Sequence, residues 1–370
     1  MFTTRGAVLR APGQPWEITE IEFDDPRQNE LKVRLTASGL CHSDDHIRLG
    51  DIPSETYPMI GGHEGAGVVV EVGPDTPGWE VGDHLVMSFL PTCGKCRWCA
   101  SGHQNLCDGG AMTLAGCRVD GTFRSRVDGQ QAGQVAGIST FCETTVISVD
   151  SAVKVAGDIP LDKAALVGCG VCTGWGSAVN SAAVKPGHTT IVMGIGGIGA
   201  NALQGARAAG ATHVIAVDPV ADKHELAQKL GATHTFGNME DATAFAQSVT
   251  NGQGADSTIV TVGVLENRHV AQAFASVRKA GTVVVTGLGN VATSMVEVPA
   301  FELAMFQKRI QGSLFGESNP SIDIPWMLAL YQSGQLDLDS LITTTYDLDQ
   351  INDGYADMHA GKNIRGVIVY

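Results

Sequence analysis

The sequence predicts an α/β protein of two domains, in which a β-rich domain is followed by a doubly wound parallel sheet. The chain has 370 residues, which is more than one ordinary compact core holds. Short segments that alternate apolar and polar residues fill its first part, whereas apolar strands alternate with helices in its middle. The second pattern indicates a parallel sheet that is covered by helices on both faces.

The first domain is predicted to cover residues 1–170, with residues 316–370 returning to it. Residues 16–21 and 31–35 alternate apolar and polar side chains as half-buried strands do, and residues 68–72 form a further strand. The chain ends in the strand-like segment 364–370, which we expect to join the same domain.

The second domain is predicted to cover residues 171–315. Its expected strands and helices alternate along the chain. The strands are expected at residues 190–193, 213–217, 258–262 and 282–286, and the helices at residues 198–209, 221–230 and 270–279. This order predicts one doubly wound sheet of ordinary domain size.

A glycine-rich turn lies between the first strand and the first helix of this second domain. The run Gly194-Ile195-Gly196-Gly197-Ile198-Gly199 fits the pattern G-x-G-x-x-G. Gly194 allows a tight turn, Gly196 lets the backbone approach a pyrophosphate, and Gly199 lets helix and strand pack closely. The phosphates of a dinucleotide would then meet the N–H groups at the helix N-terminus.

The end of the next strand favours NAD over NADP. Asp218 stands where a carboxylate would accept the hydroxyls of the adenosine ribose and repel a 2′-phosphate. Lys223 lies near enough in the sequence to reach the same ribose edge. The alternative is a glycine-rich turn beside a surface aspartate, which leaves the strand–turn–helix–strand order unexplained.

Four cysteines in one short loop predict a structural zinc site. Cys93, Cys96, Cys99 and Cys107 offer the four thiolates that tetrahedral zinc accepts. The loop carries no apolar stripe, so a metal would have to organise it. Protein atoms would fill all four positions and leave none for a substrate. The alternative is an iron–sulfur cluster, which also takes four cysteines.

Three further zinc-capable residues, Cys41, His63 and Cys169, lie far apart in the sequence, and spacing alone does not unite them. Each could equally be a buried thiol or a capped histidine. However, Gly62-His63-Glu64-Gly65-Ala66-Gly67, the four-cysteine loop, Gly168-Cys169-Gly170 and the glycine fingerprint occur in one order. Together they resemble the zinc-containing alcohol dehydrogenases of the medium-chain dehydrogenase/reductase superfamily, over essentially the whole chain.

Other segments are similar to one narrower group, the actinobacterial alcohol dehydrogenases that depend on N,N-dimethyl-4-nitrosoaniline. These segments are Gly61-Gly62-His63-Glu64-Gly65, Gln104-Asn105-Leu106-Cys107-Asp108, Gly312-Ser313-Leu314-Phe315-Gly316 and residues 361–369. That group resembles the nicotinoproteins, which hold the coenzyme through turnover. The resemblance implies a GroES-like catalytic domain joined to a Rossmann domain, a tightly bound NAD(H) and two zinc ions per chain.

The resemblance assigns Cys41, His63 and Cys169 to a catalytic zinc whose fourth position stays open. Zinc there would lower the pKa of an alcohol, whose carbon gives a hydride to the nicotinamide. Ser43 resembles the hydroxyl that hydrogen-bonds the substrate oxygen, and His46 resembles the far end of a proton relay to water. The alternatives are a plain helix cap for Ser43 and a surface histidine for His46.

Four other residues take supporting roles by the same resemblance. Asp44 matches the partner that orients the zinc-binding histidine, and Glu64 matches a carboxylate beside the metal that can ligate it transiently. Thr173 matches the residue packed against the nicotinamide. Arg365 matches an arginine that binds the pyrophosphate.

Two features concern the substrate and the cofactor phosphates. Phe89, Ile52 and Phe141 are expected to line an apolar pocket beside the zinc, which would favour uncharged primary alcohols or aldehydes. His42 departs from the family pattern, because many animal relatives carry an arginine there that pairs with the cofactor phosphates. A mostly uncharged histidine weakens that contact.

The charge and the cysteine content limit the partners and the compartment. A formal net charge of −15 argues against nucleic acid and membrane surfaces, because both need a basic face. No apolar run has the length of a signal peptide or of a membrane span, so we expect the protein to stay in the cytoplasm. In such a reducing compartment, clustered cysteines are more often metal ligands than disulfides. The expected partners are a small alcohol or aldehyde, an external electron acceptor and further copies of the chain, since relatives form homodimers or homotetramers.

Two other classes of function stay open at this point. The same scaffold could serve as a thiol-dependent formaldehyde dehydrogenase or an aldehyde dismutase. A silent NAD-binding protein would keep the fold without the chemistry. Silent relatives usually lack the catalytic ligands, whereas Cys41, His63 and Cys169 all persist here with Ser43 and His46.

Overall fold

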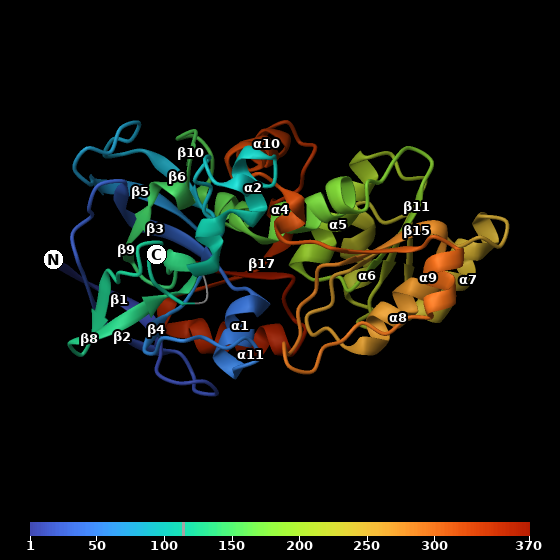
Figure 1. The fold of residues 1–370 in the computed structure, drawn as a ribbon, viewed down its shortest axis with the longest axis horizontal. Coiled ribbons are helices and arrows are strands. Elements are labelled where there is room, and N and C mark those ends of the chain that lie inside the picture. Colours follow the sequence, from blue (N-terminus) through green and yellow to red (C-terminus); the bar gives the residue numbers. More distant parts are fainter. Residues whose placement is uncertain (113–114) are drawn as a thin grey trace. The chain divides into compact units, whose positions relative to one another are not determined.

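The computed structural model describes residues 1–112 and 115–370, which form two compact units. The first unit comprises Met1–Cys169, Asn319–Ser333 and Ile342–Tyr370, and the second comprises Gly170–Ser318 and Gly334–Leu341. Figure 1 shows the β-rich first unit and the second unit, in which helices flank a sheet. The predicted α/β class, with a β-rich part and a doubly wound part, is confirmed.

The predicted return of residues 316–370 to the first unit is wrong for two segments. Residues 316–318 and Gly334–Leu341 belong to the second unit. The backbone N–H of Asp337 donates to Oε1 of Gln204 at 2.8 Å, and Nζ of Lys229 donates to Oγ of Ser340 at 2.6 Å. These hydrogen bonds to two helices hold Gly334–Leu341 against the second unit. The boundary at which the chain first passes from the first unit to the second falls after Cys169, whereas the prediction put it after residue 170.

The first unit contains a small closed barrel and a larger sheet. The barrel has the strand order β1 (Phe2–Leu9), β2 (Glu17–Phe23), β7 (Ser125–Val127), β8 (Gln130–Gln134) and β4 (Met59–Ile60). The larger sheet has the order β10 (Ala152–Val155), β6 (His84–Met87), β5 (Gly65–Val72), β3 (Glu30–Gly39), β18 (Arg365–Val369) and β17 (Ile342–Tyr346), with β9 (Thr144–Ser148) paired to β3. The predicted C-terminal strand is therefore present as β18.

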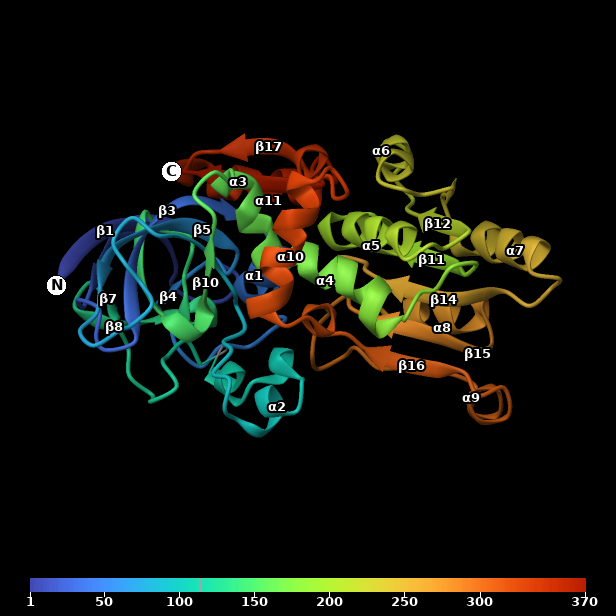
Figure 2. The same ribbon diagram turned by 90° about the horizontal axis from the view of Figure 1, so that it is seen from above.

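Short helices connect these strands. They are α1 (His42–Leu49), α2 (Arg97–Ala100), α3 (Leu161–Ala164), α10 (Pro320–Gln332) and α11 (Ile351–His359). The segment that carries α2 stands out from the strands of this unit in Figure 2. Among the described residues, no helix combines the length and the apolar character that crossing a bilayer requires.

The second unit is built on one parallel sheet of six strands. Its order is β13 (His234–Phe236), β12 (His213–Val217), β11 (Thr189–Met193), β14 (Ala255–Val260), β15 (Val277–Val285) and β16 (Arg309–Gly312). Its helices are α4 (Gly170–Gly176), α5 (Gly197–Ala208), α6 (Lys223–Lys229), α7 (Met239–Val249), α8 (Asn267–Ser276) and α9 (Ala300–Met305). The helix predicted at residues 270–279 is present but ends at Ser276, because the chain joins β15 from Val277.

Two apolar cores cover the two faces of this sheet. One core joins side chains of α5 and α6, such as Leu203 and Ala227, to Val192 and Val214. The other joins side chains of α7 and α8 to neighbouring residues of the same strands, such as Ile191. Successive strand residues point to opposite faces, so both faces are buried and the strands read as continuous apolar runs.

Candidate active site

Three residues that are distant in the sequence meet because of how β3 and β5 pair. The two strands are antiparallel, with Ser38 opposite Gly65. Cys41 follows the end of β3 as the N-cap residue of α1, and His63 precedes the start of β5. The strand register therefore brings the two side chains to the same edge of the sheet.

Cys169 completes this group because Gly168 allows the chain to pass close to β6. A Cβ at Gly168 would collide with the carbonyl oxygen of Met87. One ligand atom each from Cys41, His63, Glu64 and Cys169 lies within 4.8 Å of the others, and all four residues are buried. The three predicted ligands of the catalytic zinc thus converge in the first unit.

The electrostatics of this group suit a divalent cation. A hydrogen bond from Cys169 lowers the pKa of Cys41 well below its ordinary value, and the same contact together with burial raises the pKa of Cys169. Burial opposes a charge on His63, but Asp44 and Cys41 outweigh it and raise its pKa. A thiolate and a carboxylate already face the imidazole, and zinc prefers nitrogen and sulfur donors of this kind.

Asp44 fixes the orientation of His63. Its Oδ1 accepts the backbone N–H of Gly62 at 3.0 Å, and its Oδ2 lies 2.9 Å from Nδ1 of His63. The Asp44 carboxylate therefore occupies Nδ1 and leaves Nε2 as the atom for a metal. Burial raises the pKa of Asp44, and the neighbouring His63 opposes that rise.

Glu64 and Arg365 form a buried ion pair beside the same group. Arg365 donates to Oε2 of Glu64, and a Cβ at Gly39 would collide with that oxygen, so a larger residue there would displace the pair. Oε1 of Glu64 is buried, and no described residue forms a hydrogen bond with it. Burial raises the pKa of Glu64 to about 7, against the effect of Arg365. The orphaned oxygen and the donor set fit a bound zinc ion.

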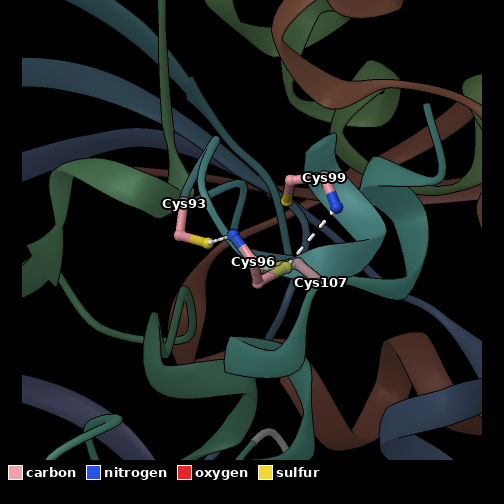
Figure 3. A group of neighbouring side chains, drawn as sticks. All are labelled: Cys93, Cys96, Cys99 and Cys107. Carbon is pink, nitrogen blue, oxygen red and sulfur yellow. Dashed lines mark hydrogen bonds between the residues drawn. The ribbon is translucent and has the colours of Figure 1, made fainter. Parts of the chain in front are cut away.

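The predicted structural site is also assembled. The sulfur atoms of Cys93, Cys96, Cys99 and Cys107 lie within 4.8 Å of one another, and Figure 3 shows the four side chains pointing toward a common centre. The backbone N–H of Cys96 donates to Sγ of Cys93, and that of Cys99 to Sγ of Cys96, each at 3.4 Å. Amide hydrogen bonds lower the pKa of Cys96 to about 6. Burial raises the pKa of Cys99 to about 12, and a bound cation would favour its thiolate. Four cysteine sulfurs around one centre suit tetrahedral zinc.

The glycine turn of the second unit has the geometry that a pyrophosphate needs. Gly194 has a φ of 94° at the end of β11, where other residues would be strained. A Cβ on Gly199 would collide with the carbonyl oxygen of Gly194, whereas a Cβ on Gly196 would have no atom within 4 Å. The first and third glycines thus shape the turn, and the second, followed by Gly197 at the start of α5, leaves open space for phosphates.

Asp218 lies at the adjacent strand end and is held in place by the turn. Its Oδ2 accepts the backbone N–H of Ile195 at 2.8 Å, and its Oδ1 accepts that of Val220 at 2.9 Å. Nζ of Lys223 donates to Oδ2 of Asp218 at 3.4 Å. Thr173 is buried in α4 of the same unit. These positions agree with the predicted cofactor roles, which stay predictions.

Comparisons with known proteins identify the family. Residues 27–157 match the model of the alcohol dehydrogenase GroES-like domain, and residues 197–333 match that of the zinc-binding dehydrogenases. The putative alcohol dehydrogenase D of Mycobacterium tuberculosis is 49% identical over 367 residues, which cover 99% of this chain and 100% of that protein. This chain belongs to the zinc-binding alcohol dehydrogenases.

Two further similarities support this family and its fold. The NDMA-dependent alcohol dehydrogenase of Amycolatopsis methanolica, named for the dye N,N-dimethyl-4-nitrosoaniline, is 48% identical over 367 residues, which cover 99% of each chain. An alcohol dehydrogenase zinc-binding domain protein from Burkholderia ambifaria has a crystal structure with a TM-score of 0.92 and 33% identity, covering 100% of this chain and 99% of that one. The resemblance seen in the sequence motifs is confirmed.

The substrate-pocket prediction for this alcohol dehydrogenase needs one correction. Phe89 meets the zinc-binding side of the unit, because its ring lies edge-on to His63 with centroids 5.5 Å apart. Ile52 is partly buried beside the core of the first unit. Phe141 has no exposed surface and packs edge-on against Trp16 and Tyr355. Phe141 is therefore a core residue, and we keep only Phe89 and Ile52 in the proposed pocket.

The helix α1 carries the predicted Ser43 and His46, and the structure adds partners that the sequence did not reveal. Oγ of Ser43 lies 3.8 Å from Sγ of Cys41, and Nδ1 of His46 lies 3.0 Å from Oδ2 of Asp51. The resemblance assigned Glu64 and Arg365 separate roles, whereas the structure shows that they form an ion pair. Burial lowers the pKa of His42, which keeps this residue of the alcohol dehydrogenase uncharged at neutral pH.

Proposed function

We propose that this alcohol dehydrogenase oxidises uncharged primary alcohols with an NAD that stays bound between turnovers. The observation that carries the proposal is the buried set of Cys41, His63 and Cys169, whose ligand atoms lie within 4.8 Å of one another. Zinc held by that set would supply a Lewis acid that lowers the pKa of an alcohol and favours hydride loss to a nicotinamide.

The residues around this set have separate tasks in the proposal. Asp44 holds the His63 ring through Nδ1, so that Nε2 stays available as a ligand. The Arg365 guanidinium pairs with Glu64 and keeps that carboxylate from acting as a permanent fourth ligand. Phe89 beside His63 gives the site an apolar wall, which excludes water and favours uncharged substrates.

A proton has to leave the alcohol when it is oxidised, and α1 supplies the groups that carry it. The Ser43 hydroxyl lies near Cys41, and His46 follows one helical turn later. A hydroxyl can donate and accept at once, and an imidazole can take up one proton and release another. We therefore assign the relay to Ser43 and His46.

The choice of NAD rests on Asp218. Its carboxylate is fixed at the strand end by two backbone N–H groups, where it would accept ribose hydroxyls and repel a 2′-phosphate. Arg365 stays our candidate for a pyrophosphate contact. The uncharged His42 contributes little to phosphate binding, so cofactor retention has to come from the glycine turn and its helix N-terminus.

We also propose that the chain works as a homo-oligomer in a reducing compartment such as the cytoplasm. Strand β16 lies at the edge of its sheet and, among the described residues, hydrogen-bonds only to β15. The adjacent α9 has no buried residue although Phe301, Leu303 and Met305 are apolar. No disulfide joins the nine cysteines, all of which lie in the described part of the chain. A second copy would cover the edge strand and the helix.

The test is to purify the protein without added coenzyme and to record its absorbance and metal content. We expect a reduced-nicotinamide band that survives dialysis, about two zinc ions per chain, and alcohol oxidation with N,N-dimethyl-4-nitrosoaniline as the acceptor. Activity only with freely added NAD would reject cofactor retention. Unchanged alcohol oxidation in Cys41→Ser would reject the mechanism, with Cys117→Ser as a matched control.

The same preparation separates the alternative chemistries. A requirement for a low-molecular-weight thiol would indicate a formaldehyde dehydrogenase. Conversion of an aldehyde to alcohol and acid without any acceptor would indicate a dismutase. We expect neither result.

A further inference from the structure

The turn after α1 places a carboxylate against the buried His46. The helix ends at Gly50, whose φ of 85° is left-handed, and the chain turns back so that the backbone N–H of Ile52 donates to the carbonyl of His46 at 3.2 Å. Oδ2 of Asp51 then lies 3.0 Å from Nδ1 of His46. The His46 side chain is 4% exposed and that of Asp51 is 27% exposed. The pair therefore joins a buried imidazole to the surface.

The chemistry of this contact fixes where the ring proton sits. An ionised carboxylate can only accept hydrogen bonds, so Nδ1 of His46 has to carry the hydrogen. Nε2 then keeps its lone pair and is the only ring nitrogen that can accept a proton. A histidine with the opposite tautomer would present an N–H at Nε2 and could not accept a proton there.

We propose that Asp51 is the positioning residue of the proton relay, because it holds His46 in the Nδ1–H tautomer and in one orientation. This inference rests on the relay role of His46 under the proposed function. When Nε2 takes up a proton, both ring nitrogens carry hydrogen and the Asp51 carboxylate balances the positive charge. Release of that proton from Nε2 to water restores the Nδ1–H tautomer, and no electrons are exchanged.

Other contacts hold α1 in place without Asp51. Asp45 accepts hydrogen bonds from Nε of Arg48 at 2.9 Å and lies 2.6 Å from Nε2 of His359 in α11, which Figure 1 shows beside α1. Asp44 anchors the first turn of the helix to Gly62. Removal of the Asp51 carboxylate should therefore change the state of His46 while α1 and the zinc ligands keep their places.

The first test reads the tautomer directly and needs no turnover. Zinc-loaded protein labelled with ¹⁵N-histidine is studied by NMR, and the His46 signals are assigned by their loss in His46→Gln. We expect the Nδ1–H tautomer in the wild-type protein, a mixture of tautomers in Asp51→Ala, and recovery in Asp51→Glu. An Nε2–H tautomer in the wild type, or an unchanged tautomer in Asp51→Ala, would overturn the proposal.

The second test measures turnover with N,N-dimethyl-4-nitrosoaniline as the acceptor. We expect kcat of Asp51→Ala to fall about tenfold while KM for the alcohol and the zinc content are unchanged, because the contact acts only when the proton moves. The exposed Asp353 in α11 provides a matched control, and Asp353→Ala should keep the wild-type kcat.

The two readouts separate failure of this inference from failure of the proposed function. A wild-type kcat in Asp51→Ala together with a slow His46→Gln would reject the positioning role and leave the dehydrogenase mechanism intact. A fixed Nδ1–H tautomer that depends on Asp51, in a protein that oxidises no alcohol, would support the positioning role and reject the proposed function.

Discussion

In the catalytic group, contacts within the protein decide which atoms of each side chain remain available to bind a metal. His63 keeps Nε2 because Asp44 occupies Nδ1, and Glu64 keeps one oxygen because Arg365 takes the other. Because Arg365 holds one oxygen of Glu64, this carboxylate would serve only as a secondary ligand of a zinc ion. Small buried polar contacts of this kind would decide how many ligands a zinc ion receives at this site.

Asp44→Asn tests the first of these contacts. An amide can donate to Nδ1 of His63 and so favour the wrong tautomer, and it loses the charge that supports the ligand. We expect the affinity for the catalytic zinc to fall about 10- to 100-fold while the four-cysteine site keeps its metal. Competition with a zinc chelator, followed by metal analysis, measures both sites in one experiment. Equal affinity in the variant and the wild type would show that Asp44 does not orient the ligand.

Residue roles were only partly predictable from the sequence. Cys41, His63 and Cys169 could be grouped only through a resemblance, because strand register, and not spacing, brings them together. Phe141 was wrongly assigned to the substrate pocket because an aromatic residue in the sequence suits a pocket and an apolar core equally well. Asp51 lies five residues after His46, but its contact depends on the left-handed turn at Gly50. That glycine was the only signal available.

Among the secondary-structure elements, the turn between β11 and α5 offers a test of two of its glycines. We expect Gly199→Ala to destabilise the fold by about 1–3 kcal/mol, because its Cβ would collide with the carbonyl oxygen of Gly194. Gly196→Ala should leave stability unchanged, since its Cβ meets no atom within 4 Å, yet it should lose bound NAD. Urea unfolding and the nicotinamide absorbance after dialysis measure the two effects. Full NAD retention in Gly196→Ala would contradict a phosphate site over that glycine.

The cysteine loop around α2 provides the second test at this scale. Because the loop has few apolar contacts of its own, its metal should hold it together. In Cys99→Ser we expect the zinc content to fall from about two to about one per chain, and amide exchange to accelerate within residues 93–107. The catalytic zinc should remain. Loss of both metals, or an unchanged exchange pattern, would show that the loop does not fold as a separate zinc-dependent element.

Elements were predicted more completely than single residues. The predicted elements of the second unit, which correspond to β11, β12, β14, β15, α5, α6 and α8, follow the apolar periodicity, since both faces of its sheet are buried. The sequence did not predict β13, β16, α4, α7 or α9. The end of α8 was missed because Val277–Lys279 continues the helical pattern, although these residues belong to β15. The position of Gly334–Leu341 was missed because its buried Leu336, Leu338 and Leu341 would suit the core of either unit. The hydrogen bonds to Gln204 and Lys229 that tie the segment to the second unit cannot be read from the sequence.

For the whole molecule, the exposed edge of the second unit predicts self-association. Phe301 and Met305 of α9 are 68% and 66% exposed, and α9 comes just before β16 in the sequence. Within the part of the chain that the structure describes, β16 pairs with β15 alone. Large apolar side chains beside a free strand edge favour a partner that covers both. A two-fold axis would let one β16 pair with the same strand of a second copy and extend the sheet. The burial of these side chains would then stabilise the assembly without involving the zinc ligands.

Phe301→Glu combined with Met305→Glu should therefore convert the protein into monomers of 38.7 kDa, as measured by light scattering. Two carboxylates in an apolar contact would have to be desolvated, which costs more than the contact contributes. Val81→Glu is a matched control, because Val81 is 68% exposed in the first unit and should leave the mass of the assembly unchanged. A wild-type protein that is already monomeric, or a variant that keeps the wild-type mass, would show that this edge is not the interface. Zinc content and cofactor retention should persist in the monomer, because each zinc-ligand group lies within the first unit and the glycine turn lies within the second.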